Sequence, residues 1–522
     1  MIQNPILKGF CPDPSIVRVG QDYYIATSTF EWWPGVHLWH SRDLAHWEQL
    51  PSPLNRISQL NMLGNPTSGE IWAPDISYDG KRFYLVFTDV KTKKGRYYNN
   101  HNYLVWAEDI CGPWSDPVYL NSTGFDPSLF HDSDGRKYLV NMRNGFKGVL
   151  VQEFDPVSGK LTGEVRNVFR GTEIGFTEGP HIYHVGDWYY CLTAEGGTGY
   201  DHCVTMARAR SVWGPYEVDP ENPVLTSDTN NPDILQKAGH GDLVETQNGD
   251  WYLVHLCARP PHGEKRCILG RETGIQKVFW NEKGWLRLCC GGRIAQNETE
   301  SPKGIESWIP AAQKEQDDFE ENALDVRYSV PRVPLGECVS LTERPGWLRL
   351  YGQESLNSLH HVSLVAVRQS EYQAAAQTCM EFYPDCPEQF AGLSYMYDAA
   401  NFYLFGKTVD EEGQPILCVI KTDTLITTDE IVPVKLPEKG PLWLRIVSGS
   451  KEASCLYSFD GQNWLDTGAR LDTEILTDEH CRGFTGAHMG MYCHDMTGRR
   501  CYADFDDYFM NCREEDGSFS PM

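Results

Sequence analysis

The sequence predicts an all-β protein in which a five-bladed β-propeller is followed by a C-terminal β-sandwich. Three observations support this prediction: a five-fold repeat of paired short strands, a polar segment after the last repeat, and a different pattern of strands beyond that segment. The chain has 522 residues, which is enough for two domains with separate hydrophobic cores. We expect the propeller to span residues 1–300 and the sandwich to span residues 317–522.

Each repeat consists of a short apolar strand, a glycine turn and an aromatic strand, a pattern typical of a β-hairpin. Aligned on the first strand, the repeats are anchored at residues 13, 73, 126, 179 and 240. A period near 50 residues, built from strands and glycine turns, is typical of propellers with one four-stranded sheet per repeat. Since the opening strand of a blade usually lines the central axis, the residues at the strand heads should converge on one axial pocket.

The domain boundary is expected between residues 295 and 316. The fifth repeat ends with Gly284-Trp-Leu-Arg-Leu, and the segment Ala295-Gln-Asn-Glu-Thr-Glu-Ser-Pro-Lys-Gly is polar and without period, as linkers are. Beyond it the repeat does not return. Many short strands with turn signals, such as the Asp-Gly turn in Tyr457-Ser-Phe-Asp-Gly-Gln-Asn-Trp, indicate a β-sandwich instead.

Composition limits the classes of partner. The 46 basic and 72 acidic residues give a net charge of −26, which argues against nucleic acid and anionic membranes as partners but not against a neutral sugar. No apolar stretch reaches membrane-spanning length, and no secretion signal is visible at the N-terminus. Without zinc-type CxxC spacing, the 17 cysteines are expected to be reduced, mostly buried thiols. We therefore expect a cytoplasmic protein; whether it forms a homo-oligomer stays open.

Three of the five repeats carry a carboxylate at the strand head: Asp13, Asp126 and Glu178. Asp-Pro and Glu-Gly pairs are also ordinary turn formers, so each acid alone has a structural explanation. However, the second repeat begins with Ala73, which means that the repeat itself does not require an acid. We therefore interpret the three acids as additions for chemistry that share one axial site.

Several motifs, matching in order over nearly the whole chain, resemble glycoside hydrolase family 43, most closely its two-domain β-xylosidases with a concanavalin-like second domain. They are Asn4-Pro-Ile-Leu-Lys-Gly-Phe-Cys-Pro-Asp-Pro-Ser15, Ser41-Arg-Asp-Leu, Glu70-Ile-Trp-Ala-Pro-Asp75, Gly124-Phe-Asp-Pro-Ser128, Phe176-Thr-Glu-Gly-Pro180, Gly239-His-Gly-Asp-Leu-Val-Glu-Thr246 and Leu269-Gly-Arg-Glu-Thr273. The resemblance implies hydrolysis with inversion of configuration. It also implies that Asp13 is the base that activates water, that Glu178 is the acid, and that the charge of Asp126 raises the pKa of that acid.

Five further residues are candidates for substrate binding: Phe30, Trp72, His240, Arg271 and Phe484. Trp72 and Phe30 would offer flat apolar faces to a sugar ring, although most aromatic residues in such a chain pack between blades. The resemblance places Arg271 beside the base, and it implies that the loop Gly483-Phe-Thr-Gly-Ala487 brings Phe484 over the propeller mouth. His240 is either a buried structural histidine or a substrate contact. No cofactor is required and no metal site is predicted, although some family members hold calcium near the matching histidine.

These observations favour an exo-acting β-xylosidase that releases xylose from the non-reducing ends of xylo-oligosaccharides. An α-L-arabinofuranosidase, or an enzyme with both activities, is the alternative, because the two sugars present similar hydroxyl groups in space. A non-catalytic carbohydrate-binding propeller is the third interpretation. The loss of any of the three acids would have favoured that interpretation, and all three are present.

Overall fold

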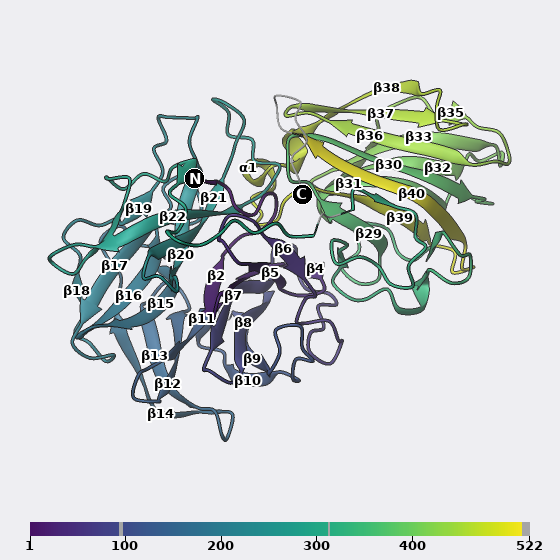
Figure 1. The fold of residues 1–522 in the computed structure, drawn as a ribbon. Helices are drawn as coiled ribbons and strands as arrows, with labels where there is room; N and C mark the ends of the chain where they lie inside the picture. Colours follow the sequence, from purple (N-terminus) through teal and green to yellow (C-terminus); the bar gives the residue numbers. More distant parts are fainter. Residues whose placement is uncertain (93–97, 312–313, 514–522) are drawn as a thin grey trace.

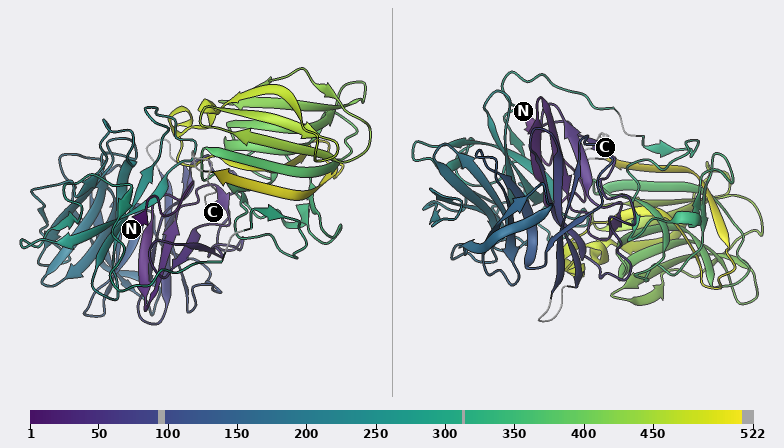
Figure 2. Two further views of the ribbon diagram at one scale, coloured as in Figure 1. Left: turned by 45° about the horizontal axis from the view of Figure 1, so that its top comes forward. Right: turned by 90° about the horizontal axis from the view of Figure 1, so that it is seen from below.

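The structure, a computed structural model, describes residues 1–92, 98–311 and 314–513. It is almost entirely β, as predicted, with a propeller and a sandwich that lie against each other (Figure 1). Two further views show the same close contact between the two domains (Figure 2). Among the described residues, no helix combines the length and apolar character needed to cross a bilayer.

Five antiparallel sheets form the blades, in chain order and without exchange of strands between them; four of the sheets have four strands, and the fourth blade has a short fifth strand. The first two blades are β2 (Ser15–Val19), β3 (Asp22–Thr27), β5 (His37–Ser41) and β6 (Glu48–Leu50), then β7 (Glu70–Tyr78), β8 (Phe83–Thr92), β9 (Asn99–Ala107) and β10 (Val118–Asn121). The third blade is β11 (Gly124–His131), β12 (Lys137–Arg143), β13 (Val149–Asp155) and β14 (Lys160–Phe169). The fourth is β15 (Glu178–Val185), β16 (Trp188–Glu195), β17 (Cys203–Ala209) and β18 (Glu217–Val218), with β19 (Leu225–Thr226) paired to β17. The fifth is β20 (Gln236–Glu245), β21 (Trp251–Ala258), β22 (Glu272–Trp280) and β23 (Leu286–Leu288). The predicted number of blades is confirmed.

The opening strands β2, β7, β11, β15 and β20 contact one another around a closed ring, so they line the axis. All five repeat anchors have a left-handed backbone: Asp13 (φ 54°), Ala73 (φ 35°), Asp126 (φ 51°), Gly179 (φ 53°) and His240 (φ 44°). Four of these are not glycine, and such residues adopt positive φ only when the surrounding structure enforces it. The repeated turn therefore aims the head side chains at the axis, which is why residues far apart in sequence share one pocket.

Below the strand heads, a layer of polar side chains at the axis joins neighbouring blades. Ser15 Oγ accepts a hydrogen bond from Ile76 N (2.8 Å), and Asp75 Oδ2 accepts one from Leu129 N (2.8 Å). Ser128 Oγ donates to Pro180 O (2.6 Å), and Asp242 Oδ2 accepts from Ile16 N (2.7 Å). Each bond connects one blade to the next, so these buried polar groups hold the ring together.

The N-terminal segment closes the ring against the fifth blade. β1 (Ile2–Gln3) pairs with β24 (Glu298–Thr299). The chain then runs along β22, with Ile6 N donating to Thr273 O (2.8 Å) and Cys11 N donating to Arg271 O (3.0 Å). This path places Asp13 next to the start of the fifth blade's third strand.

The C-terminal domain is a sandwich of two antiparallel sheets. One contains β27 (Val339–Ser340), β28 (Leu348–Tyr351), β40 (Tyr502–Arg513), β30 (Gln373–Phe382), β36 (Leu442–Ser448), β37 (Glu452–Ser458) and β38 (Leu465–Asp472), with β25 (Gln316–Asp317) paired to β40. The other contains β29 (Ser363–Arg368), β39 (His488–Asp495), β31 (Gln389–Asp398), β32 (Asn401–Val409), β33 (Pro415–Asp423) and β34 (Ile426–Asp429), with β35 (Val434–Lys435) paired to β33. Short helical turns occupy Gly336–Cys338, Thr473–Leu476 and α1 (Asp478–Cys481).

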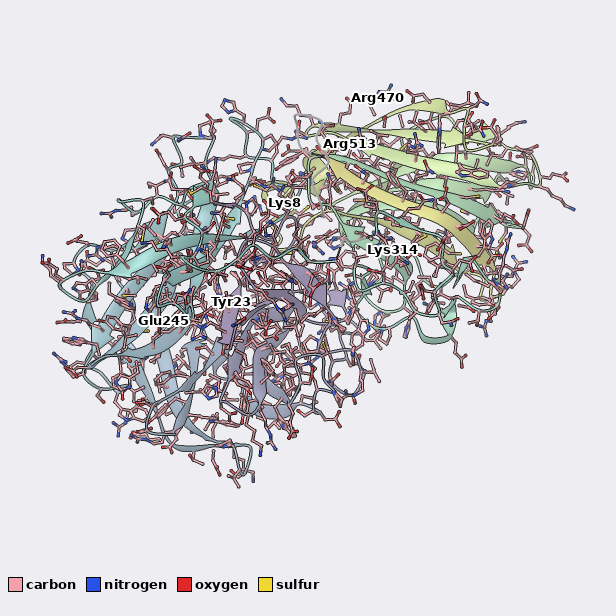
Figure 3. The ribbon with its side chains drawn as sticks, viewed as in Figure 1. Lys8, Tyr23, Glu245, Lys314, Arg470 and Arg513 are labelled. Atoms are coloured by element: carbon pink, nitrogen blue, oxygen red, sulfur yellow. The ribbon has the colours of Figure 1, made fainter. Side chains whose placement is uncertain are left out.

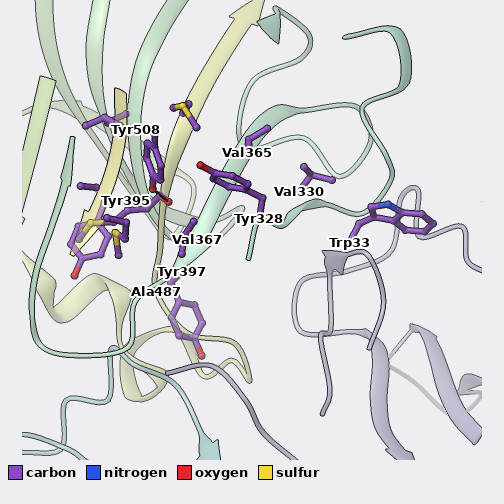
Figure 4. Packing of buried hydrophobic residues seen from close by; sticks show 14 of the residues in the cluster. Trp33, Tyr328, Val330, Val365, Val367, Tyr395, Tyr397, Ala487 and Tyr508 are labelled. Atoms are coloured by element: carbon purple, nitrogen blue, oxygen red, sulfur yellow. Dashed lines mark hydrogen bonds between the residues drawn. The ribbon is translucent and has the colours of Figure 1, made fainter. Parts of the chain in front are cut away.

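The two domains share apolar core and ion pairs. β26 (Val330–Pro331) pairs with β4 (Trp32–Trp33) of the propeller, and Figure 4 shows Trp33 beside Val330 in the largest buried cluster. Figure 3 shows Lys8 at the junction between the domains, where its Nζ lies 2.7 Å from Glu371 Oε1 of the sandwich. The sandwich is therefore firmly attached to the propeller near the pocket.

Candidate active site

One pocket of about 350 Å³ opens at the axial strand heads. It is lined by Asp13, Phe30, Trp72, Phe125, Asp126, Glu178, Thr198, His240, Arg271 and Phe484. All eight residues that the sequence nominated for the site are in this set.

Asp13 is held as a carboxylate by its neighbours. Its Oδ1 accepts a hydrogen bond from Arg271 Nη1 (3.2 Å), and its Oδ2 accepts one from Ser28 Oγ (2.7 Å). Burial by itself raises the pKa of Asp13, but the Arg271 charge, His240 and the Ser28 hydrogen bond together outweigh burial and lower it. Asp13 is therefore ionised at neutral pH and able to accept a proton from water.

Glu178, in contrast, is kept in its protonated form by its surroundings. Burial is the largest cause that raises its pKa well above the usual value, and the charges of Asp126 and then Asp13 add to it. Asp126 itself accepts a hydrogen bond from Gly179 N (2.9 Å), while burial and the Asp13 charge raise its pKa to about 7. Because the three carboxyl groups are only 6–8% exposed and interact, they release their protons as a group, Asp13 first.

Three aromatic rings form the apolar wall of the pocket. The ring centroid of Phe30 lies 6.4 Å from that of Trp72 and 5.8 Å from that of Phe484, and Trp72 and Phe484 are 5.8 Å apart. The guanidinium of Arg271 lies over both phenyl rings, 5.3 Å from Phe30 and 5.1 Å from Phe484. A sugar bound here would have apolar faces on one side and the carboxyl groups on the other.

Ser68 forms hydrogen bonds with the residues that carry two of these rings, Phe484 and Trp72, and with Glu31, which follows the third ring residue, Phe30. Its Oγ accepts a hydrogen bond from Phe484 N (2.9 Å), and its carbonyl accepts one from Trp72 Nε1 (3.1 Å). Its own N–H donates to Glu31 Oε2 (2.9 Å), the residue after Phe30. Buried and held at φ 53°, Ser68 ties the propeller wall to the sandwich loop.

The loop that carries Phe484 comes from the sandwich and rests on the fifth blade. Ala487 N donates to Ile268 O (2.8 Å), and Arg271 Nη2 donates to Phe484 O (3.1 Å). A Cβ atom at Gly270 would lie 2.3 Å from Thr485 O, so this approach requires glycine there. The second domain thus supplies one wall of the pocket, as the sequence indicated.

The profile "Glycosyl hydrolases family 43" matches residues 2–286, and "Beta xylosidase C-terminal Concanavalin A-like domain" matches residues 316–510. The chain belongs to glycoside hydrolase family 43.

Three similar proteins agree with this family. "Xylosidase/arabinosidase 43B" of Humicola insolens is 45% identical over 98% of this chain and 97% of the relative. "Beta-xylosidase" of Bacillus subtilis (strain 168) is 44% identical over 97% of this chain and 98% of the relative. A solved structure, a xylan beta-1,4-xylosidase from Bacillus halodurans C-125, superposes with a TM-score of 0.95 at 47% identity, over 98% of this chain and 100% of that one. As a family 43 member, the protein is a glycosidase, and the interpretation as a non-catalytic propeller is set aside.

Two residues that line the pocket of this family 43 protein were not predicted from the sequence. Phe125 directly precedes Asp126 at the head of β11, and Thr198 lies in the glycine-rich turn after β16. The position of Phe125 next to the strand-head residue Asp126 was an available signal, whereas no sequence signal marked Thr198. Phe125 also begins a row of aromatic contacts that leads outward, to Phe146 (5.6 Å between centroids) and then to Phe176 (5.5 Å), both of which are exposed.

One further cluster could in principle bind a metal. Asp75, His181 and Asp242 offer ligand atoms within 4.8 Å of one another in the layer below the pocket. However, Asp75 and Asp242 already accept backbone hydrogen bonds from adjacent blades, and Asp242 Oδ1 accepts another from Tyr183 Oη. We therefore assign this cluster a structural role, in which its carboxylates join adjacent blades.

Proposed function

We propose that this chain is an exo-acting β-xylosidase that removes xylose units from the non-reducing ends of short xylo-oligosaccharides. The observation that carries the proposal is a pocket at the propeller axis, walled by Phe484 of the second domain, in which an ionised and a protonated carboxyl group meet. The names of the relatives support xylose as the sugar.

The chemistry follows from the two protonation states. Asp13 takes a proton from water while the water oxygen attacks the anomeric carbon. The bond from that carbon to the glycosidic oxygen breaks, and the leaving oxygen takes the proton from Glu178. Arg271 and Ser28 favour the ionised form of Asp13, which preserves its capacity as a base between turnovers. We propose that configuration inverts, since the water attacks opposite the bond that breaks.

The proposal can be tested by following xylobiose hydrolysis with proton NMR. Release of α-xylose as the first-formed anomer, before mutarotation, is the expected result. First-formed β-xylose would contradict inversion, and no hydrolysis would contradict the substrate. Release of internal fragments from long xylan would contradict exo action.

A second activity, on α-L-arabinofuranosides, is favoured by the relative named "Xylosidase/arabinosidase 43B". Paired assays with nitrophenyl β-xyloside and nitrophenyl α-L-arabinofuranoside distinguish the two activities. We expect the higher kcat/KM on the xyloside; a higher value on the arabinofuranoside would reverse the assignment.

We also propose that the enzyme works in the cytoplasm and needs no bound metal. Its cysteines are free, including the exposed Cys111, Cys289 and Cys290, which suits a reducing compartment. The acid and base described above suffice for the reaction. Fractionation should recover the enzyme with the cytosol, and prolonged treatment with EDTA should leave xylobiose hydrolysis unchanged; a loss restored by calcium would disprove the second proposal.

A further inference from the structure

Behind Glu178 lies a histidine that the sequence patterns do not single out. His202, directly before β17, is 0% exposed, and its Nε2 lies 4.0 Å from Glu178 Oε1. Neither of these two atoms has a hydrogen-bond partner among the described residues. Buried polar atoms without partners are costly, so two of them facing each other call for an explanation.

The hydrogen of the His202 ring can be placed from its other nitrogen. Nδ1 lies 3.2 Å from the carbonyl oxygen of Lys237, which can only accept, so Nδ1 carries the hydrogen. Burial is the main cause that lowers the pKa of His202 to about 3, so the ring is neutral at working pH. A neutral imidazole with its hydrogen on Nδ1 presents a lone pair at Nε2.

Glu178 offers the complementary group. The site keeps this carboxyl protonated, so it has one O–H to donate. The charged and titratable groups that face it are Asp126, Asp13, Arg271 and His202. Asp13 uses both oxygens for Arg271 and Ser28, and Asp126 uses Oδ2 for Gly179 N, whereas His202 Nε2 is a buried acceptor without a partner among the described residues.

We propose that His202 is a positioning residue for proton donation, whose Nε2 accepts a hydrogen bond from the protonated carboxyl group of Glu178. A modest rotation of the carboxyl group closes the 4.0 Å gap to hydrogen-bonding distance, and such bonds are often long without substrate. The inference rests on the proposed role of Glu178 as the acid.

The surroundings are shaped to hold this ring. A Cβ atom at Gly239 would lie 2.4 Å from His202 Cγ, so the glycine before His240 leaves room for the imidazole. On the other side, a Cβ atom at Gly179 would lie 2.9 Å from the His240 ring. Gly239 thus makes room for the His202 ring, and Gly179 makes room for the His240 ring beside Glu178.

The contact has a consequence for each turnover. When Glu178 gives its proton to the leaving oxygen, its carboxylate faces the lone pair of His202, which disfavours the charge. Glu178 therefore regains a proton more readily from the solvent, while Asp13 loses the one it took from the attacking water. Protons balance over the cycle, and His202 itself never changes its protonation state.

The test replaces His202 by a ring without the lone pair. His202→Phe keeps the space filled and dry but turns a positive ring edge toward Glu178, which favours the carboxylate. We expect the alkaline limb of the kcat/KM profile on xylobiose to move down by about half to one pH unit. At neutral pH, kcat on xylobiose should fall roughly tenfold, with kcat on nitrophenyl xyloside nearly unchanged.

His255→Phe is the matched control. His255 is also 0% exposed and neutral, with Nδ1 against Leu256 O (2.9 Å) and Nε2 without a described partner, but it does not line the pocket. It should cost stability and leave both the alkaline limb and the leaving-group dependence in place. An unshifted limb in His202→Phe, or equal shifts in both variants, would overturn the proposal.

A measurement on the wild-type enzyme covers the case in which His202→Phe does not fold. In long-range ¹H–¹⁵N spectra, Nε2 of His202 should be unprotonated, and its shift should change as pH crosses the alkaline limb. A protonated Nε2, or a shift that does not respond there, overturns the proposal. Failure of the acid assignment is separate, because it would appear as the same leaving-group dependence in Glu178→Ala and Asp13→Ala.

Discussion

Asp13 and Glu178 have the same functional group and nearly the same burial, yet their surroundings give their pKa values opposite directions. The difference is Arg271, which donates a hydrogen bond to Asp13, whereas its charge lowers the pKa of Glu178 less than burial and the charges of Asp126 and Asp13 raise it. Pairs of titratable groups with diverging pKa values identify acid and base. The protonation states therefore agree with the roles that the family resemblance implied.

These roles predict different responses to the leaving group. Glu178→Ala should lose far more activity on xylobiose than on nitrophenyl xyloside, because a basic leaving oxygen must depart protonated. Asp13→Ala removes activation of water, so both substrates should lose rate about equally, on the order of 10²–10⁴-fold. Steady-state kinetics on the two substrates measure this. The same leaving-group dependence in both variants would show that acid and base are wrongly assigned.

Asp126 predicts a shift in pH dependence. After burial, the charge of Asp126 is the largest cause that raises the pKa of Glu178. Asp126→Asn removes that charge, so the alkaline limb of the pH–rate profile should move to lower pH. The acidic limb, set by Asp13, should move less. An alkaline limb that stays in place or rises would disprove the electrostatic role of Asp126.

The elements of the propeller were predictable because each blade repeats the same local signals. The hairpins, the blade count and the five strand heads follow from glycine turns and alternating apolar residues, and all five anchors chosen from the sequence have a left-handed backbone. Eight pocket residues followed from the motifs and the axial convergence of the heads.

Other features left no periodic signal in the sequence. The pairing of β4 with β26 joins residues about 300 positions apart, and two-residue strands have no recognisable pattern. Thr198 and His202 lie on a turn and at a strand start, where neither alternation nor a motif marks them. Their roles depend on contacts that form only in the folded protein: Thr198 lines the pocket, and His202 lies beside Glu178.

Ser68, in the turn before β7, should affect substrate binding through its hydrogen bond with Phe484. Ser68→Ala deletes the acceptor for Phe484 N, a buried hydrogen bond worth about 1 kcal/mol. Because Phe484 walls the pocket, KM for xylobiose should rise roughly fivefold, with a smaller change in kcat. Ser363→Ala, a buried serine that donates to Tyr351 O in the sandwich, should leave KM unchanged. Equal effects would mean that only general stability was altered.

The whole molecule depends on buried ion pairs between its domains. Lys237 of the fifth blade lies 2.9 Å from both Asp478 Oδ2 and Glu479 Oε1 of α1, and it is buried. Lys237→Met leaves two acids without their cation, which should destabilise the protein by roughly 3–5 kcal/mol. Arg42→Ala, which removes an exposed pair with Asp22, should change stability by less than about 1 kcal/mol. Urea unfolding of both variants checks this; equal midpoints would contradict a structural role for Lys237.

The closure of the ring by the N-terminus has a consequence for synthesis on the ribosome. β1 cannot pair until β24 has been synthesised, and Asp13 cannot form its ion pair until Arg271, 258 residues later in the chain, has been synthesised. At about 5–20 residues per second, that partner emerges at least ten seconds or so after Asp13. Until then the first blade lacks the fifth blade, against which β2 packs. Phe484 emerges later still, so a nascent chain has no complete site before nearly all of it has been made.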